Sequence, residues 1–109
     1  MYAIHVTHKR LQQLEKRIAK IKEELAAIEE MRPGSLTRQY KDPEHQSGAY
    51  YQLSYTRDMK SRTEYVPRDS VRDVRRQIAS YKRFKALTTK WIALSIERCQ
   101  LKMKRPRRP

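Results

Sequence analysis

Basic side chains recur at helical spacing in the last third of the chain. Arg72, Arg76, Arg83 and Lys90 follow one another at intervals of 4, 7 and 7 residues, which places them on one face of a helix. At about 1.5 Å rise per residue, such a face carries positive charge along roughly 27 Å. A guanidinium group can hold a phosphate through two hydrogen bonds. The spacing therefore predicts contact with a run of nucleic-acid phosphates.

Further basic residues extend this predicted surface. An adjacent strip of the helix carries Arg68, Arg75 and Lys82, and a basic tail with Arg105, Arg107 and Arg108 is expected to be disordered and to follow a phosphate backbone. We expect additional contacts from the middle third of the chain, through Arg38, Tyr50, Arg57 and Arg62. The alternative is a solvated surface helix with a solubilising tail.

Tyrosines form a second group. Five of the seven fall in a segment with strand periodicity, at Tyr40, Tyr50, Tyr51, Tyr55 and Tyr65. Exposed aromatic rings beside basic residues can stack on unpaired bases. The simpler alternative is that the rings pack a small sheet onto a helix. Tyr50 and Tyr51 fall on opposite faces of a strand, so we expect one of the two to stay exposed.

The net charge of +14 is concentrated at one end of the chain. Residues 68–109 hold fourteen Lys or Arg against three acids, whereas the first 67 residues are nearly balanced. Such a one-sided field points to DNA, RNA or an anionic membrane surface. No apolar run approaches the length that crosses a bilayer, and the N-terminus lacks the apolar core of a signal peptide. We expect a cytoplasmic protein, associated with the nucleoid or another nucleoprotein, without a membrane partner.

The residues that catalysis or metal binding would need are sparse. Cys99 is the single cysteine, which excludes an internal disulfide and a cysteine-based zinc site. His5 and His8 stand three residues apart without a nearby carboxylate. Neither a phosphate-binding loop nor a nucleophile with its base is recognisable. The sequence therefore predicts a protein that is not an enzyme, with no catalytic residue, no metal and no cofactor.

We expect a long helix before the strand segment and the basic helix. Leu11, Ile18 and Leu25 take heptad position a, and Leu14, Ile21 and Ile28 take position d. Pro33 predicts that this helix, assigned to residues 1–32, stops near Met31. In a parallel homodimer, two of three flanking charge pairs would repel. An antiparallel partner is favoured, either a second copy or the chain's own C-terminal helix, and we prefer the latter.

The middle third changes to strand periodicity. Residues 36–40, 50–57 and 61–66 alternate as strands, joined by the loop KDPEHQS and by a hairpin loop of Asp58, Met59 and Lys60. Pro67 closes the sheet, and 3.6-residue periodicity returns from about residue 69 to residue 103. The expected fold is α+β in a single domain, residues 1–103, with a helix (1–32), an antiparallel β-meander (33–67), a basic helix (68–103) packed beside the first, and a tail (104–109).

Four stretches together resemble a known family. GSL at 34–36, GAYYQLSY at 48–55, EYVP at 64–67 and the following VRDVRRQIASYKRFK are similar to a family of small uncharacterised prokaryotic proteins, catalogued as a domain of unknown function. The resemblance covers roughly residues 33–90. It implies the same order of elements and a mobile-element or phage context, and it assigns no activity. Many family members carry a cysteine cluster where this chain has KDPEHQS, so no metal role carries over.

The sequence thus favours a nucleic-acid-binding accessory or regulatory protein of a mobile element, a phage or a nucleoprotein complex. Its partners would be DNA or RNA, and a mobile-element or phage protein or a second copy of the chain could join them. The alternative is a coiled-coil protein-interaction module, acting as an adaptor or as an inhibitor of a partner enzyme.

Overall fold

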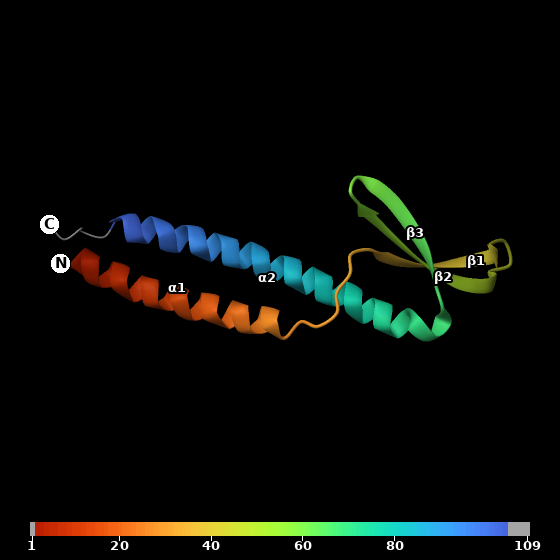
Figure 1. Cartoon of the computed structure of the whole chain (residues 1–109), viewed down its shortest axis with the longest axis horizontal. Helices are drawn as coiled ribbons and strands as arrows, with labels where there is room; N and C mark the ends of the chain where they lie inside the picture. The colour runs from red at the N-terminus through yellow and green to blue at the C-terminus, as the bar shows by residue number, and fades with distance from the viewer. Residues whose placement is uncertain (1, 105–109) are drawn as a thin grey trace. The chain divides into compact units, whose positions relative to one another are not determined.

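The structure, a computed structural model, describes residues 2–104, with side chains from Thr7 onward. Arg105, Arg107 and Arg108 lie outside the described residues. The elements follow in the order α1 (Tyr2–Ala26), β1 (Ser35–Asp42), β2 (Ser47–Arg57), β3 (Lys60–Val66), the 3₁₀ turn η1 (Arg68–Ser70) and α2 (Val71–Lys104) (Figure 1). The fold is α+β, as the sequence predicts.

Two compact units divide the chain. The helical unit comprises residues 1–28 and 84–109, and the sheet unit comprises residues 29–83. The helix α2 contributes its first part to the sheet unit and its second part to the helical unit. Each unit has its own buried cluster of hydrophobic side chains.

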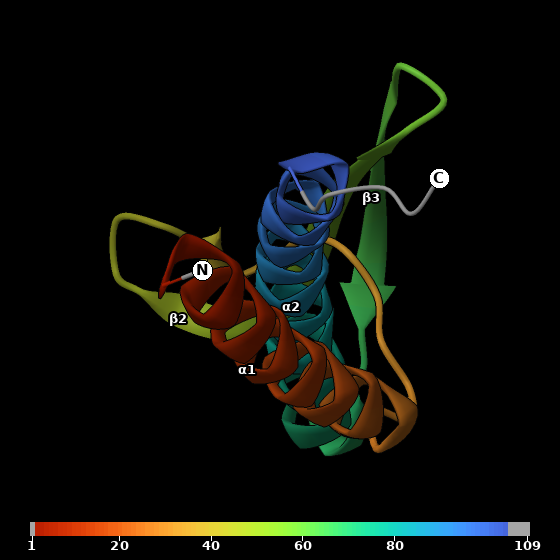
Figure 2. The ribbon, with the colours of Figure 1, turned by 90° about the vertical axis from the view of Figure 1, so that its left-hand side faces the viewer.

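In the helical unit, α1 and the second part of α2 run side by side in opposite directions (Figures 1 and 2). Leu14, Ile18 and Ile21 of α1 are buried against Leu94 of α2. Trp91 and other half-buried residues of both helices close this core. The heptad seam therefore packs on the C-terminal helix of the same chain, as we expected.

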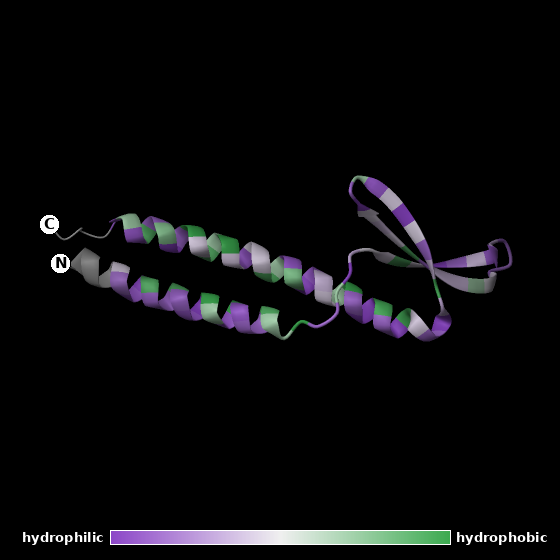
Figure 3. Cartoon of the chain, viewed as in Figure 1, coloured by the Kyte–Doolittle hydropathy of each residue, from purple (hydrophilic) through white to green (hydrophobic). Residues whose placement is uncertain are grey.

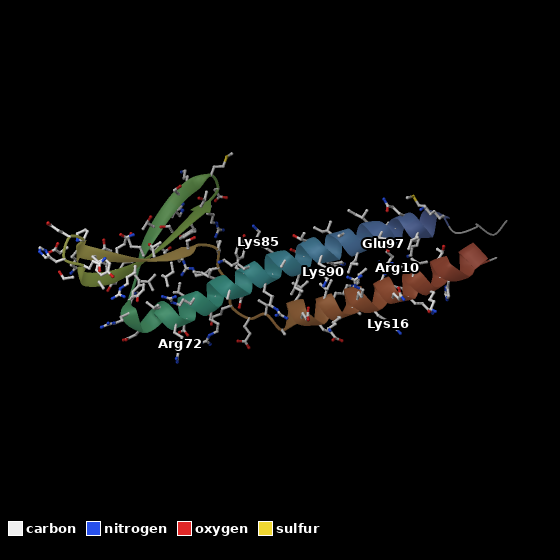
Figure 4. The ribbon with its side chains drawn as sticks, turned by 180° about the vertical axis from the view of Figure 1, so that it is seen from behind. Arg10, Lys16, Arg72, Lys85, Lys90 and Glu97 are labelled. Carbon is white, nitrogen blue, oxygen red and sulfur yellow. The ribbon has the colours of Figure 1, made fainter. Side chains whose placement is uncertain are left out.

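Side-chain pairs fix the antiparallel register of these helices. Arg10 Nε donates to Glu97 Oε2 over 2.6 Å, and Arg98 donates to Glu15 Oε1 over 3.0 Å. Further along α1, the Lys22 ammonium lies 5.3 Å from the centre of the Trp91 ring. Figure 4 shows Arg10 and Glu97 where the two helices face each other.

The first helix ends earlier than its pattern predicts. It stops at Ala26, and residues 28–34 are neither helix nor strand, so the expected helix to residue 32 is wrong. The reason is tertiary, because this segment finds its polar partners on α2. The Arg32 backbone N–H donates to the Gln77 carbonyl oxygen over 3.2 Å, and Gln77 Nε2 donates to Glu30 Oε2 over 3.0 Å.

The sheet is an antiparallel meander in the order β1-β2-β3. Leu36 of β1 pairs with Leu53 of β2, and Leu53 pairs with Glu64 of β3. One face carries Leu53 and Val66 and packs on Val74 and Ile78 of α2. We call it the core face, and the opposite one the open face. Figure 3 shows that hydrophilic residues dominate the strands, whereas hydrophobic residues recur along the helices.

The β2–β3 hairpin differs from the expectation by one residue. Its loop is Asp58 and Met59 alone, because Lys60 already belongs to β3 and pairs with Arg57. The expected three-residue loop is therefore wrong. Asp58 has φ 52° and Met59 has φ 64°, which are the positive values of a type I′ turn. This type of turn usually carries glycine or asparagine, so the turn cannot be recognised from the Asp-Met sequence.

Candidate nucleic-acid interface

The first part of α2 presents a strip of arginines. Val71, Val74 and Ile78 turn toward the sheet, so Arg72, Arg76 and Arg83 fall on the far side of the same helix and are exposed. Arg76 donates to Asp73 Oδ1 over 3.1 Å, in a pair whose side chains are 70% and 65% exposed. Exposed pairs of this kind exchange readily with solvent and with other anions. Arg72, labelled in Figure 4, lies near the beginning of α2.

The adjacent strip lies closer to the sheet. Arg75 and Lys82 are exposed, and the Arg75 guanidinium lies 6.0 Å from the centre of the Tyr51 ring. Arg68 precedes them in η1, also exposed. Arg75 thus lies beside the helix–sheet packing, whereas Arg68 precedes α2 and is not on the helical strip where the sequence placed it.

The last member of the predicted strip lies in the other unit. Lys90 is exposed on α2, within the helical unit (Figure 4). The sheet unit by itself thus carries Arg72, Arg76 and Arg83 of the four residues. The candidate interface therefore comprises residues of the sheet unit alone.

The two faces of the sheet differ in charge. The pairing places Arg38, Arg57 and Arg62 on the core face, together with the other charged strand residues except Lys41. The open face is otherwise uncharged and carries Ser, Thr, Gln and Tyr side chains. Tyr50 is on this open face. The sheet residues predicted to act together therefore do not share one face.

Tyr50 and Tyr51 separate as their alternation predicts. Tyr51 is on the core face, where it packs beside Leu53 and contacts Arg75. Tyr50 is on the open face, but both side chains are half-buried, so the expectation that one of the two stays exposed is wrong. Tyr65 joins Tyr50 on the open face because it pairs with Gln52, and it is 68% exposed.

A small cavity brings several of these residues together at one end of the sheet. It has a volume of about 190 Å³ and is lined by Arg38, Tyr50, Tyr51, Tyr65 and Arg68 with Val66. The strand β3 ends at Val66, opposite Tyr51, whereas β2 begins four residues before that point. The cavity therefore lies where β2 extends past the end of β3. We call it the tyrosine–arginine pocket.

Two members of this pocket, Tyr51 and Tyr65, are absent from the predicted interface. The sequence placed both rings in the sheet, and the two-residue turn after Arg57 decides which face Tyr65 takes. A residue pattern that revealed that turn would have identified Tyr65 as a neighbour of Tyr50.

A different polar network joins the core face to the segment before β1. Arg32 donates to Glu64 Oε2 over 3.0 Å, and the Tyr55 hydroxyl donates to Glu64 Oε1 over 2.6 Å. The hydrogen bond with Glu64 raises the pKa of Tyr55. The hydrogen bonds from Tyr55 and then Arg32 lower the pKa of Glu64. Arg32 is thus committed to an internal contact and does not join the candidate interface.

Two other kinds of feature, a metal centre and a membrane-spanning helix, are not found among the described residues. From residue 2 to residue 104, no group of three or more His, Cys, Asp or Glu side chains could hold a metal ion. Over the same residues, no helix has the length and apolar character needed to cross a membrane.

Comparison with known families places the chain in one of them. The family described as Domain of unknown function (DUF6788) matches residues 9–76, and the chain therefore belongs to it. The matched part runs from α1 through the sheet into the first part of α2. No curated protein and no solved structure matches the chain significantly.

Proposed function

We propose that this family member binds nucleic acid without catalysis, through the phosphate backbone. The observation that carries the proposal is the density of cations in the first part of α2. Residues 71–83 hold Arg72, Arg75, Arg76, Lys82 and Arg83 against the single acid Asp73, and all five basic side chains are exposed. Arginine suits this role because its fork of donors matches the geometry of phosphate.

We further propose that the protein acts as an accessory component of a larger system. Its resemblance to proteins of mobile-element neighbourhoods supports a role in a mobile element, a phage or a nucleoprotein complex, and hence association with the nucleoid. Arg68 beside the helix, and Arg105, Arg107 and Arg108 beyond it, would add phosphate contacts to those of α2.

Salt dependence provides the first test. If four arginines each neutralise one phosphate of a single strand, log K falls with log[salt] at a slope of about −2.8. Binding of a random oligonucleotide should then weaken roughly 50-fold between about 50 and 200 mM salt. Fluorescence anisotropy of labelled DNA and RNA measures this directly.

Charge reversal with a matched control localises the contact. The double variant Arg72→Glu, Arg76→Glu should weaken binding at least about tenfold, since it removes two contacts and adds repulsion. Lys16→Glu with Lys20→Glu makes the same charge change, at the same spacing, on exposed positions of α1. We expect this control to weaken binding less than about threefold. Equal effects of the two double variants would refute a localised site on α2.

A second candidate function rests on the helical unit. Ile92, Ile96 and Met103 are 61%, 54% and 72% exposed, and together with Cys99 they form an apolar stripe on α2. Their spacing of 4, 3 and 4 residues is that of a coiled-coil seam. Residues 7–28 and 84–104 carry eleven Lys or Arg against four Glu, so two copies would repel each other. The stripe therefore favours an amphipathic partner helix with acidic flanks.

A probe on the single cysteine tests this alternative. An environment-sensitive fluorophore on Cys99 should change its emission when a synthetic amphipathic helix with glutamate flanks is added. A peptide with the same apolar seam and lysine flanks serves as the control. Equal responses to both peptides, or none, would contradict an acidic partner, and a change with protein concentration alone would point to a second copy.

A further inference from the structure

We infer that the tyrosine–arginine pocket holds one unpaired base of a single strand, so that the protein selects single-stranded over double-stranded nucleic acid. This inference rests on the proposed function and names its ligand. It follows from the composition of the open face, the aromatic rings at the pocket and the place where β3 ends.

The open face of the sheet carries almost no charge. Apart from Lys41, the open face has no ionisable side chain other than its tyrosines, and Thr37, Gln39, Thr56 and Thr63 on it are exposed. Such a surface gives a phosphate backbone little attraction. It suits bases instead, because uncharged hydroxyl and amide groups can bond to base edges while aromatic rings stack on base planes.

Two tyrosine rings of the open face lie close together at the pocket. Tyr65 pairs with Gln52, and Tyr50 lies two residues before Gln52 in β2, so the two rings are diagonal neighbours on one face. Neighbours of this kind are about 7–8 Å apart, within reach of one flat ligand. Tyr65 is 68% exposed, although burial of its aromatic ring would be favourable. A stacked base would cover it.

The start of β2 has a backbone edge that no strand covers. Residues 47–50 of β2 have β1 on one side and no strand on the side that β3 has left. In an antiparallel sheet, alternate residues point both N–H and C=O to the same side. The extension of β2 therefore offers backbone donors and acceptors toward the pocket. Base edges present the complementary groups.

The tyrosine–arginine pocket has the size of one base and carries two arginines. About 190 Å³ is smaller than the 300–1,000 Å³ typical of sites for larger ligands, and it suits a single base. Arg38 and Arg68 line the same pocket, where they can bind the phosphates on either side of that base. A duplex cannot use this site without unpairing a base, which costs a few kcal/mol.

Binding measurements with three ligands test the selection. We would compare a single-stranded RNA, a single-stranded DNA of the same sequence, and the DNA duplex. Both single strands should bind at least about tenfold more tightly than the duplex, since stacking on a tyrosine is worth several-fold to 100-fold in affinity. Equal affinity for duplex and single strands would overturn the inference. A preference between RNA and DNA would identify the natural strand.

Variants of Tyr65 localise the effect. Tyr65→Ala should weaken single-strand binding about 5- to 100-fold and leave duplex binding unchanged, whereas Tyr65→Phe should retain binding because it keeps the ring. If Tyr65→Ala binds like the unaltered protein while Arg72→Glu, Arg76→Glu does not, the base pocket is wrong and the proposed function stands. If no ligand binds in a salt-dependent manner, the proposed function itself fails.

A readout on the unaltered protein avoids any dependence on folding of the variant. Single strands of RNA and DNA that contain 5-iodouracil, irradiated in the complex, form crosslinks to aromatic rings on which the base stacks. Peptide mapping by mass spectrometry should place the crosslink on Tyr50 or Tyr65. Crosslinks confined to other tyrosines would overturn the inference.

Discussion

Gly34 is a residue whose lack of a side chain is required by the fold. Its φ of 136° is one that other residues rarely adopt, and a Cβ at this position would lie 2.7 Å from Leu53 Cδ1 and 3.0 Å from the Ser54 carbonyl oxygen. Leu53 is fully buried at the centre of the sheet unit, so its side chain cannot yield easily. Gly34 thus lets the chain pass over the core as it enters β1.

The variant Gly34→Ala should therefore be destabilised by roughly 2 kcal/mol or more, from backbone strain and overpacking together. Urea denaturation followed by circular dichroism measures the change. Ser35→Ala, at the exposed next position, is the control and should alter the free energy of unfolding by less than about 0.5 kcal/mol. Similar values for the two variants would contradict the close approach over Leu53.

Glu97 should make the stability of the helical hairpin depend on pH. The hydrogen bond from Arg10, and then the positive charges of Arg10 and Arg17, hold the pKa of Glu97 below its ordinary value of 4.5. A carboxyl whose pKa is lower in the folded than in the unfolded state stabilises the fold above the unfolded pKa. That contribution is lost as the pH falls through the folded pKa.

Acidification should therefore lower the stability of the folded protein, and Glu97→Gln should remove part of this pH dependence. Thermal unfolding between pH about 6 and about 2 measures it, with the variant less stable than the natural chain at the upper end and closer to it at the lower end. Glu44→Gln, in the exposed β1–β2 loop, is the control. A difference between natural chain and variant that stays constant over this range would disprove the role of Glu97.

At the scale of elements, the β2–β3 turn determines the candidate site. Because side chains alternate between faces, a shift of one residue in pairing moves every side chain of a strand to the opposite face. A three-residue loop would have paired Tyr65 with Leu53 and placed it on the core face. The two-residue turn at Asp58 and Met59 places it beside Tyr50.

Replacement of Met59 by glycine tests this turn. Met59 is 99% exposed at φ 64°, so its side chain contributes little packing while its backbone is strained. Met59→Gly should stabilise the protein by about 0.5–1 kcal/mol, since relief of strain outweighs the entropy that glycine loses on folding. Thermal melting measures the gain. Met59→Ala retains the strain and should show no such gain, and a destabilised glycine variant would be evidence against the type I′ turn.

The elements themselves could be predicted from periodicity. The 3-4 alternation of Leu11 through Leu25 and the alternation around Leu53 are local signals, and both elements form where these signals lie. The residues at which the elements end were harder to predict from the sequence. The end of α1 at Ala26 depends on partners that Glu30 and Arg32 find about 45 residues further along the chain.

At the scale of the whole molecule, charge distribution sets the expected behaviour toward nucleic acid. Fourteen of the 26 Lys and Arg residues fall in residues 68–109. Under the proposed function, the measured salt slope counts the phosphates that these residues neutralise together. Residues beyond Lys104 would add to that count.

A chain that ends at Lys104 tests this contribution. It lacks Arg105, Arg107 and Arg108, and its slope of log K against log[salt] should be shallower by about 2 for a single strand. Anisotropy titrations at several salt concentrations give the slope. Replacement of the three arginines by lysine in the full chain should leave the slope nearly unchanged. A slope that is the same with and without these residues would exclude them from the contact.

The sequence by itself determined what depends on local pattern. It indicated the two helices, the meander and the arginine strip at Arg72, Arg76 and Arg83, and it favoured an antiparallel partner for α1. The structure then identified that partner as the chain's own C-terminal helix. Only the tertiary structure decided which sheet residues share a face. It placed Arg38 and Arg62 on one face and Tyr50 with Tyr65 on the other. The faces of Arg62 and Tyr65 depend on the backbone of a turn that Asp58 and Met59 do not reveal. The core face, with all strand charges except Lys41, and the open face, with Tyr50 and Tyr65, are thus consequences of pairing, which no single segment specifies.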